Sequence, residues 1–184
     1  MLLKHVSVDK QFYNLGLQYC NASTLQNFID LCGSLPEHTC QLILSQVVSG
    51  LCDIHSQSII HRDLKSENVF LHLADFIDLP TPQTLKTCLL ECDPSDLNVV
   101  IGDFGLSREH HQDEVVLSNV GSFIYRAPEV VSQVYTKQCD IWAVGIIFFQ
   151  MLTGRLPRSD ELYNESKIRL PIKTISQQGL ALMV

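Results

Sequence analysis

The stretch His61–Asn68 reads H-R-D-L-K-S-E-N and places an acid, an amine and an amide close together in the chain. Asp63 supplies a carboxylate that can orient a hydroxyl group and accept its proton. Lys65 supplies an ammonium group that can offset phosphate charge, and Asn68 supplies an oxygen ligand of the hard type that Mg²⁺ prefers. This combination indicates a phosphoryl-transfer site.

Two further motifs follow in order, D-F-G at Asp103–Gly105 and A-P-E at Ala127–Glu129. Together with the first stretch they resemble the catalytic loop, the magnesium-binding motif and the end of the activation segment of eukaryotic protein kinases. A solvated charged loop is the alternative, but it does not explain three ordered motifs. The resemblance covers about Phe12 to Leu156. It implies an α+β fold, mainly α, that consists of a kinase-like C-terminal lobe with a remnant of the N-terminal lobe sheet.

The composition describes a globular protein of one domain. Apolar residues make up 46% of the 184 residues and charged residues 18%. The net charge of −7 argues against a nucleic-acid surface, and the longest apolar run, Ile141–Phe149, is too short to span a bilayer. The seven cysteines include no C-x-x-C pair, and no signal-peptide pattern opens the chain. We therefore expect a cytoplasmic or nuclear protein with reduced thiols and with no nucleic-acid or membrane partner.

The resemblance divides the chain into two parts. Residues 1–20 match the last strands of the N-terminal lobe and the hinge, and Phe12–Cys20 is the expected strand. Residues 21–184 match the C-terminal lobe, shortened at its end. On this match Leu17 is the gatekeeper residue of the ATP site. An ordinary edge strand is the alternative interpretation of the first part.

The resemblance also assigns contacts around the nucleotide. The Gln18 carbonyl and the Cys20 amide would meet the adenine edge of ATP, and Phe70 would pack beneath the adenine ring. His61 and Phe104 match two members of the hydrophobic spine that aligns the kinase lobes. For these two side chains the implied role is structural.

Capping signals predict two helices before the catalytic motif. Ser23 is expected to cap a short helix that continues through Leu31 and ends at Gly33. Ser34 and Glu37 have the spacing of a capping box, which predicts the start of a longer helix with one buried face. The resemblance makes this the helix that leads into the catalytic loop.

The remaining pattern predicts strands at Val69–Leu71 and Val99–Ile101 and a fully buried helix at Asp140–Leu152. By resemblance, Asp140 holds the backbone of the catalytic loop. Ser159–Ile168 is expected to form one more helix.

Residues 75–98 form an insertion where the family has a tight hairpin, and we interpret them as a surface insertion, although long loops are also commonly functional. Cys88 and Cys92 lie in this insertion without nearby histidines, so they make a weak candidate zinc site.

The resemblance implies a serine/threonine kinase. Asp63 would be the catalytic base, and Lys65 would lie near the γ-phosphate of ATP, as in serine/threonine-specific kinases. Asn68 and Asp103 would bind Mg²⁺. The substrate would be a serine or threonine hydroxyl of a protein. The alternative is that these residues are structural hydrogen-bond partners in a kinase-derived fold.

Residues 103–129 resemble the activation segment. Arg62 precedes the catalytic aspartate, which suggests regulation by phosphorylation, and we hypothesise that phospho-Ser118 pairs with its guanidinium group. Ser122 keeps a hydroxyl group able to bond Asp63, which fits serine/threonine specificity. Regulatory proteins are therefore expected as partners besides the protein substrate.

Some parts of the family pattern are not found in this sequence. Its nine glycines form no G-x-G-x-x-G loop. Lys4 cannot be the family's strand lysine, because a helix of about ten residues would have to fit between it and Gln18. We therefore expect this chain alone to bind Mg-ATP weakly and to transfer phosphate poorly or not at all. A non-catalytic kinase-like interaction module and a truncated product remain as alternatives.

Overall fold

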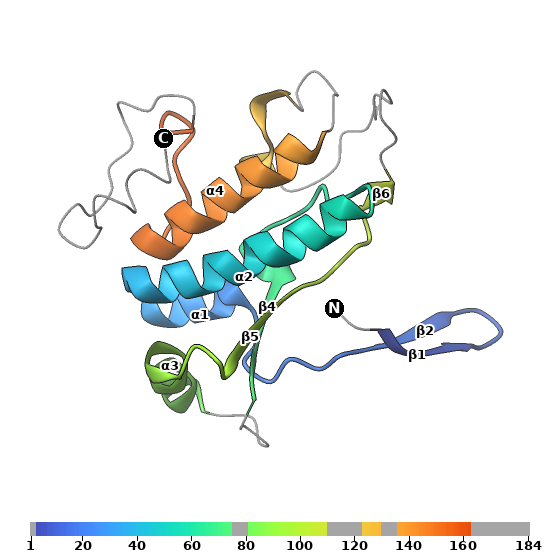
Figure 1. Ribbon diagram of the computed structural model, residues 1–184, viewed down its shortest axis with the longest axis horizontal. Helices are drawn as coiled ribbons and strands as arrows, with labels where there is room; N and C mark the ends of the chain where they lie inside the picture. The colour runs from blue at the N-terminus through green and yellow to red at the C-terminus, as the bar shows by residue number, and fades with distance from the viewer. Residues whose placement is uncertain (1–2, 75–80, 110–122, 130–135, 163–184) are drawn as a thin grey trace.

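A computed structural model describes residues 3–74, 81–109, 123–129 and 136–162. Along the chain the elements are β1 (Leu3–Val8), β2 (Tyr13–Leu17), α1 (Leu25–Cys32), α2 (Glu37–Ser56), β3 (Ile59–Ile60), η1 (Ser66–Asn68), β4 (Val69–Leu73), α3 (Pro82–Glu91), β5 (Leu97–Ile101), β6 (Arg108–Glu109), η2 (Phe123–Tyr125) and α4 (Lys137–Thr153). The helices form one body, and α2 and α4 lie side by side at its centre (Figure 1). The fold is mainly helical with small antiparallel sheets, as predicted.

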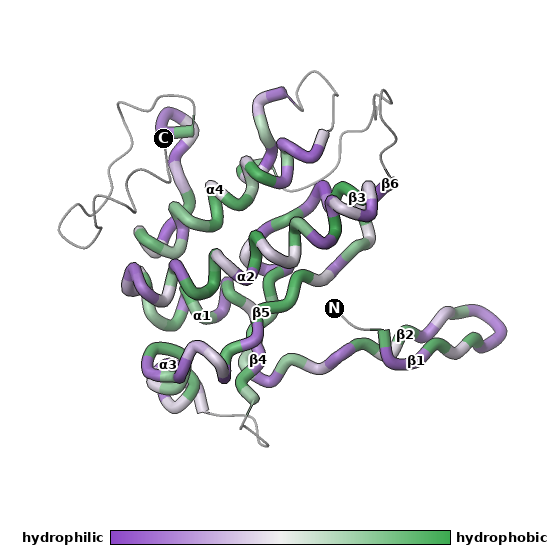
Figure 2. Tube along the Cα trace, in the orientation of Figure 1, coloured by the Kyte–Doolittle hydropathy of each residue, from purple (hydrophilic) through white to green (hydrophobic). Residues whose placement is uncertain are grey.

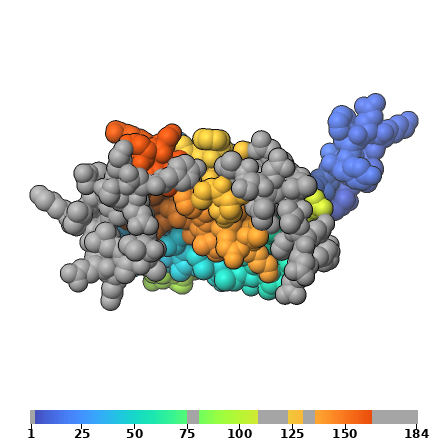
Figure 3. Space-filling view, turned by 90° about the horizontal axis from the view of Figure 1, so that it is seen from above, coloured from blue at the N-terminus to red at the C-terminus, as the bar shows by residue number. Residues whose placement is uncertain are grey.

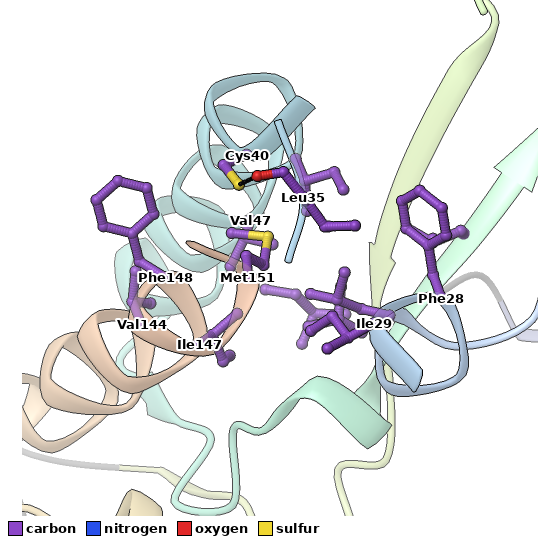
Figure 4. Close-up of a cluster of buried hydrophobic side chains, with 14 of the residues drawn as sticks. Phe28, Ile29, Leu35, Cys40, Val47, Val144, Ile147, Phe148 and Met151 are labelled. Carbon is purple, nitrogen blue, oxygen red and sulfur yellow. Dashed lines mark hydrogen bonds between the residues drawn. The ribbon is translucent and has the colours of Figure 1, made fainter. Parts of the chain in front are cut away.

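The hydrophobic core lies between α2, α4 and α1 (Figure 4). On α2 the buried apolar residues recur at helical spacing, as Cys40, Ile43, Val47 and Leu51 show. Helix α4 begins three residues before the predicted Asp140 and is buried on most of its surface, although not fully as predicted, because Ile141 is 56% exposed. The core therefore fixes the two helices that flank the catalytic loop.

Two short sheets position the loop segments. Strands β4 and β5 pair antiparallel with Val69 opposite Ile101 and Leu73 opposite Leu97, so both strands are two residues longer than predicted. Strands β3 and β6 pair antiparallel beside the catalytic loop. The first pairing brings the end of β5 next to η1.

The two predicted N-caps are wrong. Thr24 caps α1, because its hydroxyl oxygen accepts the Asn27 backbone N–H at 3.2 Å. Ser23 has a φ of 69°, and its hydroxyl oxygen accepts a bond from the Asn27 side chain instead of from the helix backbone. The helix ends at Gly33 as expected.

Helix α2 has no capping box. Pro36 is its N-cap residue and makes no side-chain capping bond. The preceding residues are held by tertiary contacts instead, since the Leu35 N–H donates to the Met151 carbonyl at 2.7 Å. Gly154 approaches the same segment so closely that a Cβ there would lie 2.8 Å from the Ser34 nitrogen. The start of α2 is therefore held by the long-range Leu35–Met151 bond and not by the predicted local capping box of Ser34 and Glu37.

The insertion is more ordered than a surface loop. Its residues 82–91 form α3, which the sequence reading missed, and Thr81 caps this helix through the Thr84 N–H at 3.3 Å. Leu89 is 2% exposed and belongs to the main core. Residues 97 and 98 belong to β5. Part of the insertion is therefore a structural component of the lobe.

Strands β1 and β2 form a hairpin that projects from the helical body (Figures 1 and 3). Strand β2 is shorter than the predicted Phe12–Cys20, and residues 9–12 connect it directly to β1, so no helix separates Lys4 from Gln18. Apolar residues, seen as green stretches of the hairpin in Figure 2, have exposed side chains there. Residues 159–162 form turns, and the rest of the predicted helix at Ser159–Ile168 lies outside the described residues.

Candidate active site

The catalytic loop is held by a single buried carboxylate. Asp140, near the start of α4 and 1% exposed, accepts the backbone N–H groups of His61 and Arg62, both at 2.9 Å. It also lies 2.8 Å from Nε2 of His55 on α2. Arg62 has a φ of 67°, a left-handed conformation that these bonds stabilise. Asp140 therefore holds the loop backbone as the resemblance implied.

The carboxylate of Asp63 forms an ion pair with Lys65. The Lys65 ammonium group lies 2.8 Å from Oδ2 of Asp63, and the two side chains are 21% and 10% exposed respectively. A fixed cationic neighbour at this distance holds the carboxylate in one orientation. The structure thus places these two predicted residues in direct contact.

Asn68 completes the loop from η1. Its side-chain Nδ2 donates to the Asp63 carbonyl at 2.9 Å, and the side chain is almost fully buried. This bond uses the nitrogen and leaves Oδ1 as the atom that can ligate a cation. Its own carbonyl accepts the Gly102 N–H at 2.9 Å, which brings the segment before Asp103 next to Asn68.

Asp103 follows β5 with a φ of 60° and an exposed side chain. The next residue, Phe104, packs its ring against His61 with centroids 5.1 Å apart. Nε2 of His61 bonds the Gly102 carbonyl at 3.0 Å. The D-F-G segment is therefore attached to the catalytic loop on both sides of Asp103. The site offers an amide oxygen and a carboxylate as donors, and such hard oxygen donors suit Mg²⁺.

The segment after the hairpin is attached to β4. The Asn21 side chain exchanges two hydrogen bonds with the backbone of Leu73, both at 2.8 Å, and the Ala22 N–H donates to the Leu71 carbonyl at 3.0 Å. Thr24 forms a bridge with Phe70, the predicted adenine neighbour. The chain just after the predicted hinge thus runs beside the strand that carries Phe70.

The predicted hinge residues lie between the hairpin and this attachment. Leu17 is the last residue of β2 and is 48% exposed, while Gln18 and Cys20 are half-buried. Burial raises the pKa of the Cys20 thiol, which keeps it neutral. Their contacts with adenine remain a prediction.

The predicted regulatory residues are only partly described. Arg62 donates from Nε to the Leu106 carbonyl at 2.5 Å. Ser118 and Ser122 lie outside the described residues, so the phosphoserine hypothesis stays a prediction. Within the described ranges, Cys88 and Cys92 belong to no group of three His, Cys, Asp or Glu side chains that could hold a metal ion.

Two features of this region were missed in the sequence. His55 contacts Asp140, and a polar cluster surrounds Ser66 and includes Gln150 of α4. Gln150 could have been noticed, because it is a polar residue beside the apolar run of a buried helix. A buried polar side chain requires partners.

The chain was compared with known proteins. The family described as "Protein kinase domain" matches residues 1–179. Human serine/threonine-protein kinase ULK1 is 34% identical over 144 residues, which cover 78% of this chain and 12% of that protein. ATG1b of Arabidopsis thaliana is 35% identical over 145 residues (78% and 18%), and mouse serine/threonine-protein kinase 33 is 32% identical over 159 residues (84% and 30%).

The chain therefore belongs to the protein kinase family, and the similar proteins named above are of the serine/threonine type. It spans less than a third of the length of each of these relatives. Among the residues that the structure describes, no helix is long and apolar enough to cross a membrane.

Proposed function

We propose that this chain supplies the catalytic loop of a protein serine/threonine kinase, which transfers the γ-phosphoryl group of ATP to serine or threonine hydroxyls of protein substrates. The contact that carries the proposal is the Asp63–Lys65 pair, held next to Asn68 by the Asn68 side chain's bond to the Asp63 carbonyl. Family membership supports it.

Asp63 orients the substrate hydroxyl and accepts its proton as the oxygen attacks phosphorus. The new O–P bond forms while the bond from the γ-phosphorus to the bridging oxygen breaks, and the electron pair leaves with ADP. Lys65 offsets charge on the transferred group and holds the Asp63 carboxylate in place. Positioning and electrostatics of this kind supply most of the rate in phosphoryl transfer.

Asn68 and Asp103 are the residues that would hold Mg²⁺, through Oδ1 of the amide and through the carboxylate. The ion supplies charge neutralisation for the phosphate oxygens. The backbone bond between Gly102 and Asn68 keeps the two donors on neighbouring segments. Leu17, Gln18, Cys20 and Phe70 would line the adenine side.

Regulation and location belong to the same proposal. Phosphorylation of Ser118, with the Arg62 guanidinium as its partner, would order the activation segment, and Ser122 would contact the catalytic loop. The expectation of regulatory proteins follows from the activation segment and that of a cytoplasmic or nuclear location from the composition, and both remain predictions.

The test is transfer of labelled γ-phosphate from Mg-ATP to a serine/threonine-rich protein such as casein. The 184 residues contain no G-x-G-x-x-G loop, so slow transfer is expected from this chain. Asp63→Asn should lower this rate by about 10²-fold or more, whereas Asp53→Asn, an exposed control on α2, should not change it. Transfer that is insensitive to Asp63→Asn would overturn the proposal.

A further inference from the structure

A cluster of four uncharged side chains lies behind the catalytic loop, and the proposed mechanism does not use it. Ser66 of η1 has its hydroxyl oxygen 2.6 Å from Oε1 of Gln26, 2.9 Å from the Tyr125 hydroxyl and 2.9 Å from Oε1 of Gln150. We call Ser66, Tyr125, Gln150 and Gln26 the Ser66 network. Its members come from four different elements, η1, η2, α4 and α1.

The network is closed by the orientation of Gln26. Its Nε2 donates to Oδ1 of Asp30 at 2.7 Å, one turn further along α1, so its Oε1 faces Ser66 and Gln150. That oxygen accepts Nε2 of Gln150 at 2.7 Å. Oε1 of Gln150 is then left to accept the Tyr125 hydroxyl at 2.9 Å. Both amides thus have a fixed orientation.

A carboxylate also approaches the Ser66 network, because Oε2 of Glu67 lies 3.3 Å from the Ser66 hydroxyl oxygen. The two hydroxyl groups hold one proton each, so Ser66 can donate to only one of its neighbouring oxygens at a time, and Nε2 of Gln150 supplies a proton to Oε1 of Gln26. Ser66 is fully buried, Gln150 is 3% exposed and Tyr125 is 6% exposed. Burial raises the pKa of Tyr125 to about 12, so its hydroxyl remains a donor. A buried network with all its members satisfied is rigid and specific.

The position of Ser66 in the chain links the rigid Ser66 network to the catalytic loop. Ser66 directly follows Lys65 and begins the turn that ends at Asn68. The Asn68 N–H donates to the Lys65 carbonyl at 3.0 Å across this turn, and the Asn68 side chain bonds the Asp63 carbonyl at 2.9 Å. A shift of Ser66 must therefore move the residues on both sides of it.

Tyr125 couples the network to the other end of the kinase machinery. It is the last residue of η2, shortly before the A-P-E motif, and the Arg126 N–H closes that turn on the Phe123 carbonyl at 3.2 Å. Phe123 is 74% exposed. The Ser66 network thus joins the end of the activation segment to the loop that carries Lys65 and Asn68.

We propose that the Ser66 network is a positioning device that sets the geometry of Asn68 relative to Asp63 according to where η2 lies. Ser66 and Tyr125 are positioning residues, and neither contacts the reacting atoms. The inference rests on the proposed kinase function for its catalytic consequence, but its structural part stands independently. A 1 Å displacement near a reacting centre can cost about 10²-fold in rate, so a modest hydrogen-bond device is sufficient.

The test uses the full chain and the variants Ser66→Ala, Tyr125→Phe and their combination. The first readout is hydrogen exchange at the Asn68 and Gly102 amides, which bond Lys65 and Asn68 respectively. Each single variant should speed exchange at both amides by about tenfold. The controls Ser45→Ala and Tyr13→Phe remove hydroxyl groups away from the network and should leave both rates unchanged.

The combined variant should exchange no faster than the faster single variant, because members of one unit are not additive. Tyr125→Phe keeps the aromatic ring in the core and removes only its hydroxyl group, so it decides the question if Ser66→Ala fails to fold. In the transfer assay kcat should fall by about tenfold with less than a threefold change in KM for the protein substrate. A role in stability alone would leave kcat per folded molecule unchanged.

The outcomes separate this inference from the proposed function. Unchanged exchange at Asn68 in both variants, or additive effects in the combined variant, would overturn the Ser66 network even if transfer depends on Asp63. Coupled exchange in a chain without any transfer would support the network's structural part and count against the kinase function. Coupled exchange with an unchanged kcat would overturn the positioning role.

Discussion

The catalytic loop and the β1–β2 hairpin differ in how the chain supports them. The loop is held by Asp140 on α4, by the Ser66 network and by the bond between Gly102 and Asn68. The hairpin has exposed side chains on every residue of β1 and on most of β2, with Tyr13 79% exposed. Both regions would contribute to one nucleotide site, but only the loop is fixed by contacts within the described residues.

This difference shows that the catalytic loop, which carries the proposed chemistry, is also the better supported of the two regions. Long-range hydrogen bonds into a buried helix keep an unusual backbone conformation at Arg62, whereas the hairpin relies on its own ladder. An isolated hairpin is marginally stable in water. Free energy of unfolding should therefore respond strongly to changes around the loop and weakly to changes in the hairpin.

The largest effect is expected at Asp140. Asp140→Ala would leave the buried N–H groups of His61 and Arg62 without their acceptor, and each such loss costs about 1–3 kcal/mol. We expect a total loss of about 3–5 kcal/mol in the free energy of unfolding, measured in urea. Asp53→Ala, an exposed change on α2, should stay within about 0.5 kcal/mol. A loss below about 1 kcal/mol for Asp140→Ala would show that the loop is held by other contacts.

The second effect tests whether the insertion belongs with the loop or with the hairpin. Leu89 of α3 is 2% exposed and packs in the main core. Leu89→Ala should lower the free energy of unfolding by about 2–4 kcal/mol, because it removes buried methyl groups and leaves a cavity. Gln83→Ala on the exposed side of α3 is the matched control. Equal, small changes in the free energy of unfolding for the two variants would mean that the insertion is a surface segment.

The sequence predicted those parts of the fold that depend on local pattern or on family motifs. The buried helix α4 and the one-sided helix α2 were readable because apolar spacing reports burial directly. Asp63, Lys65 and Asn68 were readable because they lie within one short motif. Their mutual contacts follow from the tight turn at η1.

The remaining features depend on contacts that local pattern does not contain. Ser23 and Ser34 were predicted to be caps. In the structure Thr24 caps α1, and the Leu35–Met151 backbone bond holds the start of α2. Helix α3 has a mixed surface pattern and becomes recognisable only when Leu89 meets the core. Such outcomes are set by tertiary packing, which overrides local preference.

A smaller and pH-dependent effect on the free energy of unfolding is expected from the ion pair that follows α4 in the chain. Arg155 donates two hydrogen bonds to the Glu161 carboxylate at 2.8 Å, and the Arg158 N–H adds a third. These bonds lower the pKa of Glu161 to about 2 from 4.5. Because the folded-state pKa is depressed, the stabilisation is present above pH 4.5 and is lost as the pH falls towards 2.

Glu161→Gln should therefore reduce stability at pH 6 and lose its disadvantage between pH 4.5 and pH 2. Urea midpoints of both proteins across this window measure the difference. Glu91→Gln, an exposed change at the end of α3, is the control and should not produce this convergence. A constant gap between Glu161→Gln and the unmodified chain at all pH values would contradict the assigned ion pair.

The smallest effect is expected in the hairpin. Leu15 is 59% exposed and pairs with Val6 across the ladder. Leu15→Ser should change the free energy of unfolding by less than about 0.5 kcal/mol, because its side chain loses little buried area. Hydrogen exchange should be fast along β1 and β2 and slow along α2 and α4. A large decrease in the free energy of unfolding for Leu15→Ser would contradict this expectation. It would mean that the apolar face of the hairpin is buried against another part of the protein.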